Sequence, residues 1–161
     1  TGLRIAREFG YRLVIDHGPA AVLLADRLAE RGVPVLIGPL LTSRSKVELR
    51  NRSLANPGRL AAAGVELGII TDHPVVPVHF LHVQAALAVR EGLDPAAALR
   101  AVTLTPARVL GLDDRLGSLE PGKHATLCIW SGDPLDARSR VETAWIEGRQ
   151  VFGADPDNPP F

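Results

Sequence analysis

Two residues of this chain have the side-chain type and the position expected of metal-binding or proton-accepting groups. His17 follows an apolar run that ends at Asp16, and Asp72 follows another apolar run that ends near Thr71. If both runs are strands of a parallel sheet, the two side chains lie at the carboxyl ends of strands, where α/β folds collect ligands and catalytic groups. An imidazole and a carboxylate brought together there could bind a divalent metal and accept a proton from metal-activated water. The alternative is that both residues only cap the helices that follow them.

Two further residues are candidates for contact with a substrate. His73 adjoins Asp72 and could orient it or touch a substrate, although a histidine in a turn before a proline is commonly structural. Arg44 lies in the polar stretch between Gly38 and Asn56 and could bind an anionic group of a substrate. Long loops of this kind often carry function. The alternative for Arg44 is a solvated surface charge.

Other chemical classes have weaker support. His79 and His82 have a spacing that can hold a metal on one helix face, but no third ligand lies near them in the sequence, which favours a partly buried helix face. The serines lack a G-x-S-x-G setting, and the chain contains neither G-x-G-x-x-G nor G-x-x-x-x-G-K-[ST]. These absences argue against a serine nucleophile and against a phosphate-binding loop.

Strand and helix patterns alternate along the first two thirds of the chain. Apolar periodicity predicts helices over residues 2–10, 20–31, 57–63, 78–90, 95–102 and 106–110, and strands over 11–16, 33–37 and 65–70. Asp94 and Thr105 are predicted N-caps, each followed by proline. Such alternation is typical of a parallel α/β sheet or barrel. After Gly111, strands predicted over 124–130, 141–146 and 149–152 indicate a small antiparallel element.

The composition excludes several kinds of partner. The 161 residues carry 18 basic and 18 acidic side chains, so no basic field exists for nucleic acid or an anionic membrane surface.

The single cysteine, Cys128, cannot form an internal disulfide, and no apolar stretch approaches the roughly 20 residues that span a bilayer. We therefore expect a cytoplasmic protein. The chain contains no methionine, and we expect it to be part of a longer polypeptide.

Two short motifs, taken with this order of elements, resemble those of a known family. The motifs are L-T-P-A-R-V-L-G at residues 104–111 and G-S-L-E-P-G-K at residues 117–123. With the strand ends at His17 and Asp72, they look like the C-terminal part of the metal-dependent amidohydrolase superfamily, and most like imidazolonepropionase-like amidohydrolases. The likeness covers nearly the whole chain.

The resemblance implies a fold of the α/β class. Residues 1–115 would form about strands six to eight of a TIM-like (β/α)₈ barrel, and residues 116–153 would form part of a small β-sandwich. Residues 154–161 would be an irregular tail.

The resemblance also implies an activity. Family members hydrolyse C–N bonds of amides or cyclic amides in small-molecule substrates through metal-activated water, with one or two divalent ions, of which zinc is the expected one. By this resemblance Asp72 is a metal ligand and general base, and His17 is a ligand or a group that polarises the substrate. His73 and Arg44 are the expected substrate contacts.

The chain departs from the family pattern in two places. The H-x-H motif of the first barrel strand and the ligands of the fourth and fifth strands have no counterpart, so we expect a missing N-terminal part of the same polypeptide to complete the site. Three strands cannot close a barrel, so we expect the isolated chain to be inactive and its open edges to favour association, for instance as a homo-oligomer. Family members also usually carry an acidic pair where this chain reads Lys-His-Ala-Thr-Leu at residues 123–127, a change that affects local packing more than chemistry.

Two other functional hypotheses stay open from the sequence. The chain could be a non-catalytic α/β binding module that retains the scaffold without the metal site. A doubly wound ligand-binding domain is a further alternative, against which the missing phosphate loop argues.

Overall fold

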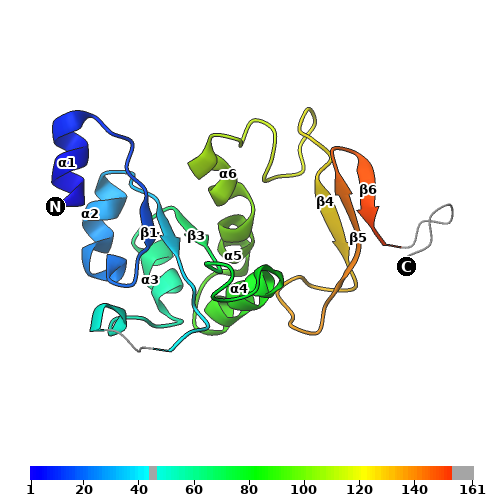
Figure 1. Ribbon diagram of the computed structural model, residues 1–161, viewed down its shortest axis with the longest axis horizontal. Coiled ribbons are helices and arrows are strands. Elements are labelled where there is room, and N and C mark those ends of the chain that lie inside the picture. The colour runs from blue at the N-terminus through cyan, green and yellow to red at the C-terminus, as the bar shows by residue number, and fades with distance from the viewer. Residues whose placement is uncertain (44–46, 154–161) are drawn as a thin grey trace.

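The computed structural model describes residues 1–43 and 47–153, and Figure 1 shows its two sheets with helices between them. The helices and strands, in chain order, are α1 (Gly2–Phe9), β1 (Ile15–His17), α2 (Ala25–Glu30), β2 (Val35–Ile37), α3 (Asn56–Ala62), β3 (Leu67–Ile69), α4 (Leu81–Arg90), α5 (Pro95–Val102), α6 (Leu104–Leu110), β4 (Leu127–Trp130), β5 (Val141–Ile146) and β6 (Arg149–Phe152). Three short 3₁₀ segments, η1 (Ala21–Leu24), η2 (Val47–Leu49) and η3 (Val78–Phe80), complete the described structure.

The first sheet is parallel, with the strand order β1-β2-β3. Its register pairs His17 with Ile37 and Ile37 with Ile69, so the three strands end at the same edge. Strand β2 is central and β3 is buried along its whole length, as expected for apolar strands covered by helices. The predicted α/β class is therefore confirmed, and the ends of β1 and β3 lie on either side of β2.

Helices α4 and α5 pack against β3 through small side chains. Ala85, Ala88, Ala98 and Ala101 are completely buried, which brings these helices close to each other and to the sheet. Asp94 caps α5 as predicted, because its carboxylate accepts a hydrogen bond of 2.8 Å from the backbone N–H of Ala97.

Several boundaries differ from the sequence prediction, and β2, β3 and α4 each begin two or three residues later than predicted. The first strand begins at Ile15 rather than residue 11, because the ladder starts only where β2 offers Val35 as partner. The helix predicted over 20–31 is split into η1 and α2. Thr105 is not an N-cap, since α6 begins at Leu104 and Thr105 is buried inside it. Proline at 106 still lies in the first helical turn, where its missing N–H leaves no hydrogen bond unmade.

The second sheet is antiparallel, with the strand order β4-β5-β6. It lies at the far end of the molecule from β1, beyond α4, α5 and α6 (Figure 1). The rings of His82 on α4 and Trp130 on β4 lie 5.1 Å apart, and Leu135 packs against the main core. Strands β5 and β6 have the predicted bounds, whereas β4 begins at Leu127 instead of residue 124.

Within residues 1–43 and 47–153, no helix is long and apolar enough to cross a membrane.

Candidate active site

His17 and Asp72 meet at the carboxyl edge of the parallel sheet. His17 is the last residue of β1, Asp72 lies three residues beyond the end of β3, and His17 Nε2 is 3.1 Å from Asp72 Oδ2. The contact spans β2, the strand between β1 and β3, which ends at Ile37. The side chains remain 45% and 39% exposed, so a ligand can reach both.

The backbone at both residues is unusual. His17 has φ +63° and Asp72 has φ +52°, and Glu147 is the third non-glycine residue of the described structure with a positive φ. Such a conformation costs on the order of 1–3 kcal/mol and occurs often at functional sites, where it directs a side chain. Two of the three cases therefore coincide with the pair that the sequence singled out, which strengthens the functional interpretation over that of simple helix caps.

Asp16 contacts the other side of the imidazole. Its Oδ2 lies 3.3 Å from His17 Nδ1, and its Oδ1 accepts a hydrogen bond of 2.8 Å from the backbone N–H of His17. The pKa of His17 is raised above its ordinary value of 6.5, chiefly by the hydrogen bond to Asp72, with Asp16 adding to the effect and burial opposing it. A metal at Nε2 would therefore compete with protonation of this ring.

The donor set fits a divalent metal in part. Zinc binds imidazole nitrogen and carboxylate oxygen at about 2.0–2.2 Å, so two such donors of one tetrahedral ion lie roughly 3.3–3.5 Å apart. The observed separation of 3.1 Å between His17 Nε2 and Asp72 Oδ2 is close to this value. The described residues contain no group of three or more histidine, cysteine or acidic side chains that could hold an ion. His17 and Asp72 could therefore supply two ligands, and an ion bound there would need its other ligands from outside the described residues.

A small cavity adjoins His17 on the side of the loop that follows β2. Its volume is about 10 Å³, room for about one water molecule, and its polar wall is formed by Arg52, Ser53 and Asn56. Asn56 is 2% exposed; its Nδ2 donates to the carbonyl oxygen of Asn51 at 2.7 Å, and its Oδ1 has no hydrogen-bond partner in the described structure. The burial of Arg52 lowers the pKa of its guanidinium.

Sequence reasoning did not single out Arg52 or Asn56 as site residues. The only sequence signal for substrate contacts in this region is the polar stretch between two apolar runs, and the candidate predicted from it is Arg44. Arg44 itself lies outside the described residues. Because a loop has no regular period, its sequence does not indicate which of its side chains turn toward the sheet.

The other predicted histidines lie outside the cavity beside His17. His73 is exposed beside Asp72 and does not line the cavity at His17. His82 is half-buried, as predicted, but His79 is exposed and lies in η3, before α4 begins. The His79 ring packs on Phe80, with ring centroids 4.3 Å apart, whereas His82 packs on Trp130.

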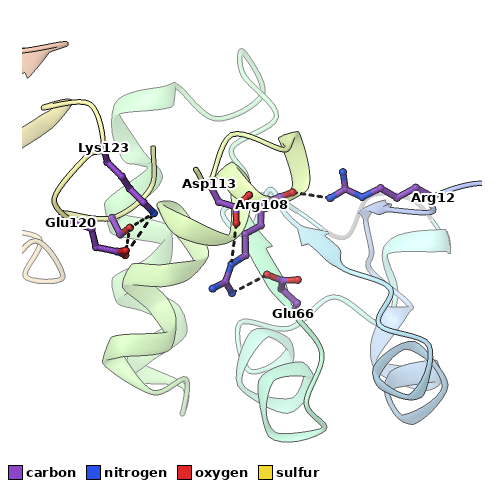
Figure 2. A network of polar contacts seen from close by, with 7 residues as sticks. Arg12, Glu66, Arg108, Asp113, Glu120 and Lys123 are labelled. Carbon is purple, nitrogen blue, oxygen red and sulfur yellow. Dashed lines mark hydrogen bonds and ion pairs between the residues drawn. The ribbon is translucent and has the colours of Figure 1, made fainter. Parts of the chain in front are cut away.

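The two sequence motifs form ion pairs away from this edge (Figure 2). Arg108 lies 3.4 Å from Glu66, which precedes β3, and 3.9 Å from Asp113, and its carbonyl oxygen accepts from Arg12, which precedes β1. These contacts therefore connect α6 to the amino ends of two strands, where polar groups mainly serve stability.

The second motif, residues 117–123, is held together internally. Lys123 Nζ lies 2.6 Å from Ser118 Oγ and 3.6 Å from Glu120, as Figure 2 shows for the carboxylate. Gly117 has φ +92° and packs so tightly against α6 that an added Cβ would come within 2.8 Å of the Ala107 Cβ. The motif is thus structural.

Residues 2–158 match the family model described as "Amidohydrolase family". This chain belongs to the amidohydrolase family. Imidazolonepropionase from Erwinia tasmaniensis is 33% identical to the amidohydrolase chain over 147 residues, which are 89% of this chain and 31% of the relative. A 5-methylthioadenosine/S-adenosylhomocysteine deaminase from Desulforudis audaxviator is 36% identical over 113 residues, 64% of this chain and 25% of the relative.

The fold of the amidohydrolase chain is also similar to solved structures. An amidohydrolase from Thermotoga maritima superposes with a TM-score of 0.90 at 47% identity, over 94% of this chain and 40% of that one. Curated relatives are covered over 8% to 32% of their own lengths. The sequence-based likeness to the amidohydrolase superfamily, with imidazolonepropionases among the relatives, is thereby confirmed.

Proposed function

We propose that this amidohydrolase chain carries part of the active site of a metal-dependent enzyme that hydrolyses a non-peptide C–N bond of an amide or cyclic amide. The supporting observation is the contact of 3.1 Å between His17 Nε2 and Asp72 Oδ2 at the carboxyl edge of a parallel sheet. Relatives named as a deaminase, a deacetylase and an imidazolonepropionase support C–N hydrolysis in general.

The proposed architecture extends the resemblance drawn from the sequence. Strands β1, β2 and β3 would be about strands six to eight of a (β/α)₈ barrel, which takes roughly 250 residues when complete. The segment with β4, β5 and β6 would belong to a β-sandwich. A preceding segment of the same polypeptide would supply the remaining strands and metal ligands. The intact polypeptide is the natural protein that contains these 161 residues.

His17 Nε2 and Asp72 Oδ2 would hold a divalent ion, with zinc as the expected one. When bound, such an ion lowers the pKa of a water molecule enough for that water to attack a carbonyl carbon near neutral pH. Asp72 accepts the proton of the attacking water at its carboxylate and passes it to the leaving nitrogen. Its exposure of 39% leaves the carboxylate accessible for this transfer.

His17 has two possible roles that the same geometry allows. It either ligates the ion through Nε2 or, when protonated there, donates a hydrogen bond to the substrate carbonyl oxygen. Asp16, 3.3 Å from Nδ1, holds the ring orientation in both cases. His73 and Arg44 remain proposed substrate contacts, and the polar wall of Arg52 and Asn56 bounds the same region.

Metal analysis of the intact polypeptide tests this proposal. We expect one or two equivalents of zinc in the wild type, and loss of both metal and hydrolysis of an amide panel in Asp72→Asn. Asp113→Asn is the matched control, because Asp113 has similar exposure, 47%, and contacts Arg108, which also contacts Glu66 before the amino end of β3. Retention of metal and activity in Asp72→Asn would contradict the assigned roles. A wild-type protein that neither holds metal nor hydrolyses amides would support the non-catalytic module instead.

A further inference from the structure

Gln84 connects the ends of two neighbouring strands from inside the core. It lies on α4 and is completely buried. Its Oε1 accepts a hydrogen bond from the backbone N–H of Leu40, shortly after β2, and its Nε2 donates to the carbonyl oxygen of Ile70, directly after β3, at 3.2 Å. Both ends of the amide are therefore used, and both partners belong to segments that leave the sheet at the edge of His17 and Asp72.

Backbone hydrogen bonds link one of these segments to His17 and fix the turn that carries Asp72. The N–H of Gly38 donates to the carbonyl oxygen of His17 at 3.4 Å, which links the segment after β2 to the end of β1. Two residues beyond Ile70, the carbonyl oxygen of Asp72 accepts from the N–H of Val75 at 2.8 Å and closes a turn. The positions of His17 and Asp72 thus both depend on the two segments that Gln84 holds together.

We propose that Gln84 is a positioning residue, which keeps Asp72 at the distance from His17 that metal binding needs; this inference rests on the proposed function. A completely buried amide is costly unless its donor and acceptor are both satisfied. Gln84 therefore favours the one arrangement in which Leu40 and Ile70 approach α4 together. An apolar side chain of the same size would fill the space and leave both backbone groups without that partner. Gln84 acts through Ile70 and does not itself touch the metal position.

Zinc affinity of the intact polypeptide tests the role of Gln84. Gln84→Met preserves side-chain volume and removes both hydrogen bonds. We expect its Kd for zinc, measured by competition with a chelator, to rise about tenfold to a hundredfold, the usual effect of losing a residue that orients metal ligands. In the metal-free protein, the ring resonances of His17 should shift toward those of Asp72→Asn, because the contact between the two side chains is weakened.

Two variants separate positioning from general stability. Gln84→Glu is the conservative change: a carboxyl buried at this point is protonated and offers one acceptor and one donor, so zinc affinity should stay close to the wild-type value. Leu28→Ala truncates a core side chain that is 2% exposed on α2, away from the strand ends. It should lower the Tm and leave both the zinc Kd and the His17 resonances unchanged.

The outcomes decide between a positioning and a structural role. If Gln84→Met lowers the Tm as Leu28→Ala does, yet keeps the zinc Kd and the His17 resonances, the proposal is overturned. Should Gln84→Met fail to fold, Gln84→Asn makes the same test, because its amide is one methylene too short to bond Leu40 and Ile70 together. If the wild type binds no zinc, the proposed function fails, while the His17 resonances still decide the role of Gln84.

Discussion

Replacing Gly38 with alanine tests how closely the ends of β2 and β3 pack beside the site. Gly38 has φ +153°, and a Cβ built there would overlap the carbonyl oxygen of Ile70 and come within 2.9 Å of Ile70 Cγ1 and 3.0 Å of Ile70 C. Two of these three atoms are backbone, so no side-chain rotation relieves the overlap. The variant must either separate β2 from β3 or change the backbone angles at residue 38.

The expected cost has two parts. A strained φ costs on the order of 1–3 kcal/mol, and overpacking a close contact costs about 1–3 kcal/mol more. We therefore expect Gly38→Ala to lower the free energy of unfolding of the intact polypeptide by about 2–6 kcal/mol, measured by urea denaturation followed by circular dichroism. Because Ile70 lies two residues before Asp72, the same displacement should weaken zinc binding.

A second glycine separates the two contributions. Gly92 has φ +104°, and an added Cβ there meets no atom within 4 Å, so Gly92→Ala carries the backbone strain alone. Gly38→Ala should therefore be the more destabilising substitution by about 1–3 kcal/mol, the cost of overpacking. If the two substitutions cost the same, Gly38 does not approach Ile70 this closely in solution.

Three further predictions concern the core, a helix cap and an ion pair. Leu60→Ala should cost about 2–5 kcal/mol in urea denaturation, because Leu60 is completely buried; a loss below about 1 kcal/mol would contradict that burial. Asp94→Ala should cost about 1 kcal/mol and Asp94→Asn less, since only the alanine removes the acceptor for the Ala97 N–H at 2.8 Å. The pKa of Asp136 is lowered from 3.8 to about 2 by hydrogen bonds from Arg138, so Arg138→Ala should raise it toward 3.8 in a carboxyl NMR titration, and an unchanged value would contradict the pairing. Because the folded-state pKa is the lower one, this ion pair stabilises the fold above about pH 3.8, and the contribution is lost as the pH falls through about 2.

The order of elements can be predicted from the local sequence pattern because glycines and capping residues mark the ends of helices. Gly10 and Gly111 end helices in the left-handed conformation that glycine favours, and Asp94 caps α5 through its side chain, the latter as the sequence predicts. Strand lengths are less predictable. Apolar runs mark burial, whereas a strand extends only as far as a neighbour offers backbone groups; Ile15 begins β1 where Val35 becomes available.

The chemical groups at the carboxyl edge of the parallel sheet can be predicted from the sequence alone. His17 and Asp72 stand where apolar runs end, and the carboxyl ends of parallel strands share one edge, so their proximity to that edge is readable without coordinates. Tertiary structure alone decided that Nε2 and Oδ2 meet at 3.1 Å, because the contact spans β2 and depends on positive φ angles at both residues. The burial of Gln84 in the core was likewise decided by the tertiary structure alone. A polar side chain in a helical pattern predicts a surface position. Its burial is favourable only because the backbone groups of Leu40 and Ile70, which are remote in sequence, form hydrogen bonds with it.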